Sequence, residues 1–334
     1  MPHRNNRPVG TGLEGQRALQ AANAKLAAKA NGRESAQAGG STHGLHFTLR
    51  APLAPFDRRV TPIRGDLADI ALAGRFFAPH YVEPRQFRCG AESAMMLGEG
   101  QINAIAVSQL LPGEAFAVLD IAGEYCWGYS LHDGYCGYVA RTALADNAPQ
   151  PTHIVAARAA LVFAEPDIKT SLIARLPMGS QFSVTGESED GRFWQTANGY
   201  ISKRHAVPID SPVSDPVALA HQLIGAPYLW GGRDGDGLDC SGLVQLVLGL
   251  SGIDAPRDSD QQMECLGRSL GLDAPVQRGD LVFFPGHVGI MADDETLIHA
   301  NAYWMQTVAE PLADVIARFP SEAGNPVLAR KRLD

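Results

Sequence analysis

The stretch that decides the fold is "GAPYLWGGRDGDGLDCSGLVQLVLGL", residues 225–250. A loop rich in glycine and aspartate runs into a single cysteine, Cys240, and an almost wholly apolar run follows directly. Leu243, Val247 and Leu250 recur at i, i+4 and i+7, which predicts a buried helix beginning near Cys240. The sequence therefore places one thiol where a loop meets the N-terminus of a buried helix.

A thiol at a helix N-terminus is expected to have a lowered pKa. Unpaired backbone N–H groups and the helix dipole stabilise an anion there, and the thiolate is the nucleophilic form of cysteine. Gly242, just inside the helix, costs about 1 kcal/mol against alanine, which indicates that something must approach the helix start closely. We interpret Cys240 as a candidate nucleophile, with a small core residue as the alternative.

A thiol nucleophile needs a base, and two histidines lie in a suitable pattern. The segments "HVGIM" (287–291) and "TLIHA" (296–300) read as strands on either side of the turn-like "ADDE". If the hairpin is centred on Asp293, His287 lies directly opposite His299, with the two Cβ atoms roughly 5 Å apart. His287 can then take the thiol proton while His299 orients its ring. For each histidine alone, a structural role is the alternative.

Metal-binding interpretations of the same residues are weaker. Cys240, His287 and His299 could ligate zinc, but a clear fourth ligand is missing. The segment "DGDGLD" fails as a calcium loop, because Leu238 occupies a ligand position and Gln245 stands where a bidentate glutamate is needed. We therefore expect no metal and no other cofactor.

The chain before the catalytic region divides into four parts. Residues 1–45 are rich in small and polar residues and are predicted to be a disordered tail. Residues 46–85 read as ordered but irregular. From residue 86 short strands and turns repeat: "LLPGEAFAVLD" (110–120) resembles "LPMGSQFSVTG" (176–186), and Trp127 recurs as Trp194. This repeat predicts two small β-barrels in tandem, over residues 86–147 and 152–208.

A proline-rich linker, "PIDSPVSDP" (208–216), precedes a region of mixed helices and strands that we assign to residues 209–334. A helix is predicted over residues 217–224, capped by Ser214 or Asp215 with Pro216 in its first turn. The segment "GDLVFF" (279–284) reads as a further strand. The fold class is therefore two small all-β barrels followed by an α+β domain.

The bulk composition excludes some classes of function. The 334 residues carry a net charge of −8, which argues against nucleic acid as the main partner. The five cysteines contain no C-x-x-C pair, and so few in a chain of this length fit a reducing compartment. The N-terminus lacks a secretory pattern, and no window approaches eighteen apolar residues. We expect a cytoplasmic protein without a membrane span.

Taken together, these motifs resemble the NlpC-type cell-wall cysteine peptidases, which are papain-like in fold. The two predicted barrels resemble bacterial SH3 domains, an arrangement typical of the γ-D-glutamyl-diamino acid peptidases of that family. The order Cys, His, His matches the triad of the family. The matching segments are "YLWGG…LDCSGLV" (228–244), "PRDSDQQ" (256–262), "RGDLVFF" (278–284), "HVGI" (287–290) and "IHA" (298–300).

The resemblance implies a role for each matching residue near the thiol. Cys240 is the nucleophile, His287 the general base and His299 the orienting third member. Tyr228 matches a tyrosine that helps to hold the oxyanion, with packing against the glycine loop as its alternative role.

Five further residues are implied in substrate binding, each with a structural alternative. Asp239 and Ser241 would contact the dipeptide, or serve as a turn aspartate and a helix-start serine. Arg257 would meet a substrate carboxylate, or form a structural ion pair. Glu114 and Tyr135 of the first barrel would close the pocket around the substrate amine, or be a surface-turn glutamate and a core tyrosine. Ser180 takes the place of Glu114 in the second repeat.

The expected function is hydrolysis of the bond between γ-D-glutamate and a diamino acid in peptidoglycan stem peptides. The expected partners are free peptides with an N-terminal L-alanine, released during cell-wall recycling. Three alternatives stay open: a non-catalytic protein that binds wall peptides, a thiol amidase or acyltransferase on the same fold, and an exported enzyme that acts on intact wall.

Overall fold

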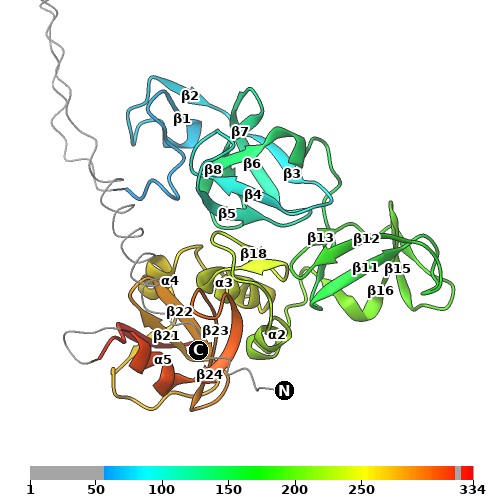
Figure 1. Ribbon diagram of the computed structural model, residues 1–334. Helices are drawn as coiled ribbons and strands as arrows, with labels where there is room; N and C mark the ends of the chain where they lie inside the picture. Colours follow the sequence, from blue (N-terminus) through cyan, green and yellow to red (C-terminus); the bar gives the residue numbers. More distant parts are fainter. Residues whose placement is uncertain (1–55, 320–324, 334) are drawn as a thin grey trace, which may run out of the picture. The chain divides into compact units, whose positions relative to one another are not determined.

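The computed structural model describes residues 56–319 and 325–333 (Figure 1). The predicted tail over residues 1–45 and the first part of segment 46–85 lie outside the described residues. The described part begins with short elements, of which β1 and β2 pair in parallel. Their bounds are β1 Leu67–Asp69, the 3-10 helix η1 Ile70–Leu72 and β2 His80–Val82.

An antiparallel seven-stranded sheet, in the order β5-β4-β8-β7-β6-β3-β9, forms the first small β-module. Phe116 and Val118 alternate along β6 and are buried together with Met96 and Val139 from neighbouring strands. The bounds are β3 Arg85–Cys89, β4 Ala94–Leu97, β5 Ala106–Leu110, β6 Ala115–Ala122, β7 Tyr125–Ser130, β8 Cys136–Ala140, the 3-10 helix η2 Arg141–Ala143 and β9 Leu144–Ala145.

The second β-module repeats the first in its central strands. Trp127 lies on β7, which pairs with β8, and Trp194 lies on β15, which pairs with β16. Strand β8 carries the segment "GYV" (137–139), and β16 carries the similar segment "GYI" (199–201). The bounds are β10 His153–Val155, β11 Ala159–Phe163, β12 Leu172–Pro177, β13 Gln181–Phe182, β14 Gly186–Glu187, β15 Phe193–Thr196, β16 Gly199–Ser202, the 3-10 helix η3 Lys203–His205 and β17 Ala206–Pro208. The exact domain boundaries stay predictions.

The remaining elements surround a six-stranded antiparallel sheet in the order β20-β25-β21-β22-β23-β24. Helix α2 begins after Asp215, whose side chain accepts hydrogen bonds from the N–H groups of Val217 and Ala218, so Asp215 is the cap and Ser214 is not. The bounds are α2 Pro216–Gln222, β18 Arg233–Asp234, β19 Gly237–Leu238, α3 Cys240–Leu250, α4 Ser259–Cys265, β20 Arg268–Leu270, β21 Leu281–Phe284, β22 His287–Met291, β23 Thr296–Asn301, β24 Gln306–Pro311, α5 Leu312–Arg318 and β25 Ala329–Arg332.

The main core lies between α3 and this sheet, and it positions the site. Leu243 and Val247 of α3 pack with Ile290 of β22 and Ile298 of β23, and all four side chains are fully buried. Helix α3 therefore lies against β22 and β23 (Figure 1), and the thiol of its first residue, Cys240, lies beside the backbone N–H of Val288 in β22. Within residues 56–319 and 325–333, no helix is both long and apolar enough to cross a membrane.

Candidate active site

Cys240 is the first residue of α3, as the sequence predicts. Asp239 caps this helix: its Oδ1 accepts from the N–H of Gly242 at 2.8 Å, and its Oδ2 accepts from the N–H of Gly231 at 2.8 Å. One aspartate thus ties the glycine loop to the first turn of the helix. Asp239 therefore fixes the backbone before and after Cys240, and this holds the thiol at the N-terminus of α3.

The prediction that this position lowers the pKa of the thiol is wrong for the resting protein. Burial raises the pKa of Cys240 to about 12, and the Asp239 carboxylate adds to the rise. The backbone N–H of Val288 and the Arg257 guanidinium act in the opposite direction but are outweighed. Desolvation disfavours the charged form of a buried group. The thiol is therefore protonated at rest and depends on a base to become nucleophilic.

We expect the alkylation rate of Cys240 by iodoacetamide to rise about tenfold per pH unit between about pH 6 and pH 10, because only the thiolate reacts. Since the folded pKa lies above the ordinary value of 9.0, the thiolate fraction at neutral pH is smaller than that of a free cysteine. Mass spectrometry of the Cys240 peptide gives the rate, with the exposed Cys265 as an internal reference. A rate that levels off below about pH 8 would reveal a preformed thiolate and contradict this expectation.

The two histidines lie together on adjacent strands. Nε2 of His287 lies 2.7 Å from Nδ1 of His299, and the ring centroids are 4.9 Å apart. Both rings are buried, and Phe284 and Phe319 lie beside His287 with centroid distances of 6.1 and 5.8 Å. The structure thus brings together the pair that the sequence predicts on one face of the sheet.

The register of the hairpin differs from the prediction. Ile290 pairs with Ile298, so the turn is centred one residue later than expected. The two histidines are consequently diagonal neighbours, and the prediction of direct opposition is wrong. They still share a face, because the offset amounts to two residues and side chains alternate with a period of two.

His287 is held in its neutral form, which is the form that can accept a proton. Burial, and then the neighbouring His299, hold its pKa well below the usual range; Glu310 raises the pKa and Arg318 lowers it. The ring is therefore neutral at physiological pH. In the described part of the chain the Cys240 thiol makes no hydrogen bond to the His287 ring. It contacts the backbone N–H of Val288, the residue that follows His287 on β22.

Glu310 on β24 is a member of this cluster that the sequence analysis missed. Its Oε1 lies 2.8 Å from Nε2 of His299, and the amide nitrogen of Asn301 lies 3.0 Å from the same ring atom. The signal was the alternation in "QTVAEP" (306–311), which places Glu310 two residues after Val308, the strand partner of His299.

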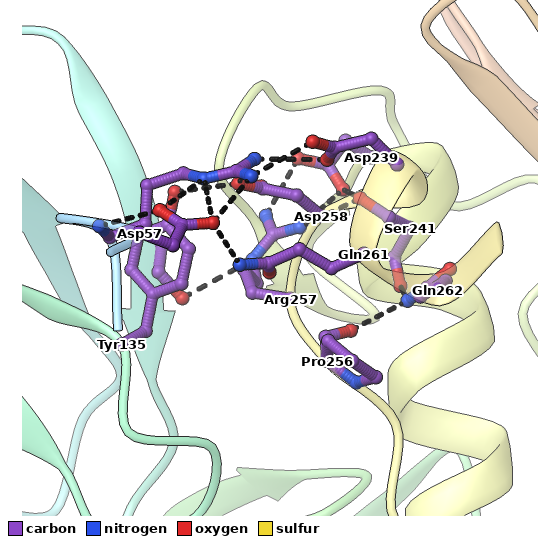
Figure 2. A network of polar contacts seen from close by, with 12 residues as sticks. Asp57, Tyr135, Asp239, Ser241, Pro256, Arg257, Asp258, Gln261 and Gln262 are labelled. Atoms are coloured by element: carbon purple, nitrogen blue, oxygen red, sulfur yellow. Dashed lines mark hydrogen bonds and ion pairs between the residues drawn. The ribbon is translucent and has the colours of Figure 1, made fainter. Parts of the chain in front are cut away.

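A second network holds the loop before α3 (Figure 2). Arg257 is 1% exposed and donates to Asp239 Oδ2 at 2.6 Å, Asp239 Oδ1 at 3.0 Å and Ser241 Oγ at 3.0 Å. The structure therefore shows the ion pair that the sequence left as the alternative for Arg257. The substrate contacts expected of these three side chains stay predictions, since their polar groups are satisfied by one another.

Glu114 does not present a free carboxylate. It is 3% exposed and pairs with Arg233, itself 2% exposed, through contacts of 2.8 and 3.1 Å. Its Oε2 also accepts from the N–H of Leu111 at 2.8 Å. A substrate amine at this carboxylate would have to displace a buried guanidinium. In this structure Glu114 ties the first β-module to β18, and the expectation that it binds a substrate amine stays a prediction.

Tyr135 reaches the catalytic region by another route. Its hydroxyl donates to Asp258 Oδ2 at 2.9 Å, and Arg59 donates to the same oxygen at 2.8 Å (Figure 2). Asp258 directly follows Arg257, so Tyr135 lies next to the network that holds the start of α3. Sequence reasoning included Asp258 only as part of the "PRDSDQQ" motif and did not assign it a role.

Tyr228 lies beside the thiol. Burial raises the pKa of its phenol, and the neighbouring Cys240 and Asp239 raise it further. The hydroxyl therefore stays protonated and can donate a hydrogen bond. Within the described ranges no group of three histidine, cysteine, aspartate or glutamate side chains is placed to hold a metal ion.

A thiol at the N-terminus of a buried helix, which packs against the strands that carry a histidine pair, is the arrangement typical of a papain-like cysteine peptidase. Residues 225–314 match the NlpC/P60 family, and residues 99–144 match the bacterial dipeptidyl-peptidase Sh3 domain. The chain therefore carries an NlpC/P60 cysteine peptidase domain and an SH3-like domain, which confirms the resemblance and the fold class predicted from sequence.

Named relatives support the same assignment. The chain is 28% identical over 236 residues to dipeptidyl-peptidase 6 of Lysinibacillus sphaericus, covering 63% of this chain and 86% of the relative. It is 26% identical over 226 residues to the γ-D-glutamyl-L-lysine dipeptidyl-peptidase of Bacillus cereus, covering 58% and 66%. The crystal structure of an NlpC/P60 family protein from Bacillus cereus superposes with a TM-score of 0.62 at 19% identity, over 74% of this chain and 99% of that one, and shows the fold alone.

Proposed function

We propose that this protein hydrolyses the bond between γ-D-glutamate and a diamino acid in peptidoglycan-derived peptides. The observation that carries the proposal is the placement of Cys240 at the start of α3, beside β22 and β23, where Nε2 of His287 lies 2.7 Å from Nδ1 of His299. The relatives named above as dipeptidyl-peptidases supply the bond and the substrate class. The proposed substrates are free peptides in the cytoplasm. Cell fractionation followed by an activity assay of each fraction tests this location.

The chemistry follows from the geometry of the ring nitrogens. Nε2 of His287 is engaged by His299, so Nδ1 is the atom left to take the thiol proton. The sulfur then attacks the γ-carbonyl carbon, and the oxyanion lies near the first N–H groups of α3 and the Tyr228 hydroxyl. His287 returns the proton to the leaving amine of the diamino acid. Water hydrolyses the resulting thioester and regenerates the thiol.

Recognition of a free substrate amine requires a carboxylate, and the side chain of Asp258 is 25% exposed whereas that of Glu114 is 4% exposed. Asp258 accepts a hydrogen bond from Tyr135, for which the family resemblance implies a place in the amine pocket. Burial raises the pKa of Asp258, while Arg257, Tyr135 and Arg59 oppose the rise. A buried ammonium is stable only against an acceptor of opposite charge. We therefore propose that Asp258 and Tyr135 together bind the free N-terminal amine of the substrate.

The test is mass spectrometry of the purified protein incubated with L-Ala-γ-D-Glu-meso-diaminopimelate or with its N-acetylated form. We expect cleavage of the free peptide, much weaker cleavage of the acetylated one, and loss of this preference in Asp258→Asn. Equal cleavage of both peptides by the wild type would remove the amine-reading role and favour intact wall as the substrate. Acyl transfer to an added amine in place of hydrolysis would favour the acyltransferase alternative.

A further inference from the structure

Three titratable side chains form a diagonal row across adjacent strands: His287 on β22, His299 on β23 and Glu310 on β24. His299 pairs in register with Val308, and Glu310 lies two residues further on, so it shares the face of the two histidines. The two contacts that join the row measure 2.7 and 2.8 Å. The row ends on a carboxylate, which the Cys–His–His arrangement alone does not require.

The carboxylate of Glu310 is held in its ionised form. Arg318 of α5 donates from Nη1 at 2.8 Å and from Nη2 at 2.5 Å, and Trp304 donates from Nε1 at 3.2 Å. The side chains of Glu310 and Arg318 are only 12% and 17% exposed. Burial alone would raise the pKa of Glu310, but the hydrogen bonds from Arg318, His299 and Trp304 outweigh it and hold the pKa well below its usual range.

An ionised carboxylate only accepts hydrogen bonds, and this determines which ring nitrogen of each histidine in the row carries a proton. His299 must donate from Nε2 to Glu310, so its Nδ1 accepts from Nε2 of His287. A neutral imidazole carries a single N–H, which leaves Nδ1 of His287 without a proton. The Asn301 amide nitrogen at 3.0 Å from the same Nε2 does not reverse this order, because the carboxylate contact is shorter and charge-assisted.

We propose that Glu310 is a positioning residue that sets the tautomer of both histidines and leaves Nδ1 of His287 free to accept the thiol proton. Arg318 is its counterpart: it orients the carboxylate and offsets its charge, and the face of Tyr303 packs against the guanidinium at 4.3 Å. The proposal deepens the proposed function, because it rests on His287 acting as the base. The proposal distinguishes the two residues by their effects: Glu310 sets the tautomers of the histidines, and Arg318 lowers the pKa of His287 by offsetting the charge of Glu310.

The charged and titratable groups near His287 come from every element around it. They are His299 of β23, Glu310 of β24 and Arg318 of α5. The Cys240 thiol of α3 lies beside Val288, the residue after His287. Removing the Arg318 cation leaves Glu310 uncompensated, which stabilises the protonated ring and raises the pKa of His287. Removing the Glu310 charge has the opposite electrostatic effect and also releases the tautomer.

The experiment is ¹⁵N NMR of the histidine side chains in the full chain, paired with the pH dependence of peptide hydrolysis. In the wild type we expect both rings protonated at Nε2 near neutral pH. Glu310→Gln keeps the shape, but its amide can donate or accept, so mixed tautomers and a kcat about tenfold lower are expected. Arg318→Met should keep the Nε2–H tautomer and move the acid limb of kcat to higher pH. The matched control is Glu295→Gln, an exposed glutamate in the turn before β23.

Each outcome decides the proposal. Unchanged tautomers with an unchanged kcat in Glu310→Gln would overturn it, and so would acid-limb shifts of the same direction in Glu310→Gln and Arg318→Met. If Arg318→Met fails to fold, Arg318→Gln replaces it, and Arg318→Lys should restore the wild-type pH profile. The NMR measurement needs no substrate. Correct tautomer changes in a protein that cleaves none of the peptides would therefore support the positioning role and reject the proposed substrate.

Discussion

Replacing Cys240 by alanine is expected to lower the rate of peptide hydrolysis by about 10⁶-fold, because the attacking atom is lost and the remaining groups cannot form the thioester. The fold should persist, since the side chain is small and buried against an intact helix, and the loss of stability should stay near 1 kcal/mol. The measurements are product formation by mass spectrometry and the thermal unfolding temperature.

The matched control for this variant is Cys265→Ala. Cys265 lies at the end of α4 and is exposed, and we expect wild-type rates from its removal. Hydrolysis by Cys240→Ala within tenfold of the wild type would show that another group attacks the substrate. Loss of activity in both variants would indicate that the assay depends on general thiol chemistry.

Replacing Arg257 by methionine is expected to destabilise the protein by about 3–5 kcal/mol, because Asp239 would keep a buried charge without its partner. The guanidinium also donates to Ser108 Oγ at 3.2 Å, so its loss leaves further polar groups unpaired. Since Asp239 caps α3, activity should fall together with stability. Urea denaturation of the wild type and the variant gives the difference in free energy of unfolding.

Two controls separate this effect from the loss of any ion pair. Arg278→Met breaks the ion pair between Arg278 and Asp215, whose side chains are 47% and 46% exposed. We expect this variant to lower the free energy of unfolding by about 0–1 kcal/mol. Arg257→Lys keeps the charge but cannot reproduce the two-pronged contact with Asp239, so it should rescue only part of the loss. A loss in Arg257→Met no larger than that in Arg278→Met would refute the role of the buried pair.

Local pattern alone was sufficient for the elements that carry the candidate catalytic side chains. The apolar spacing after Cys240 predicts α3, and two short apolar runs on either side of a turn-like segment predict the strands that hold His287 and His299. Helix starts and strand faces depend on residues a few positions apart, so a single sequence contains the information. The motifs around these residues were also specific enough to indicate the family and the tandem β-modules before it.

Only the tertiary structure decided which charges meet and what burial does to them. The hairpin register differs by one residue from the prediction, Glu310 joins the histidines through a strand pairing, and Glu114 faces Arg233 across 119 positions of sequence. The pKa of Cys240 rises because desolvation outweighs the helix terminus. Electrostatic effects depend on distance and on exclusion of water, and the packing of segments far apart in the chain sets both.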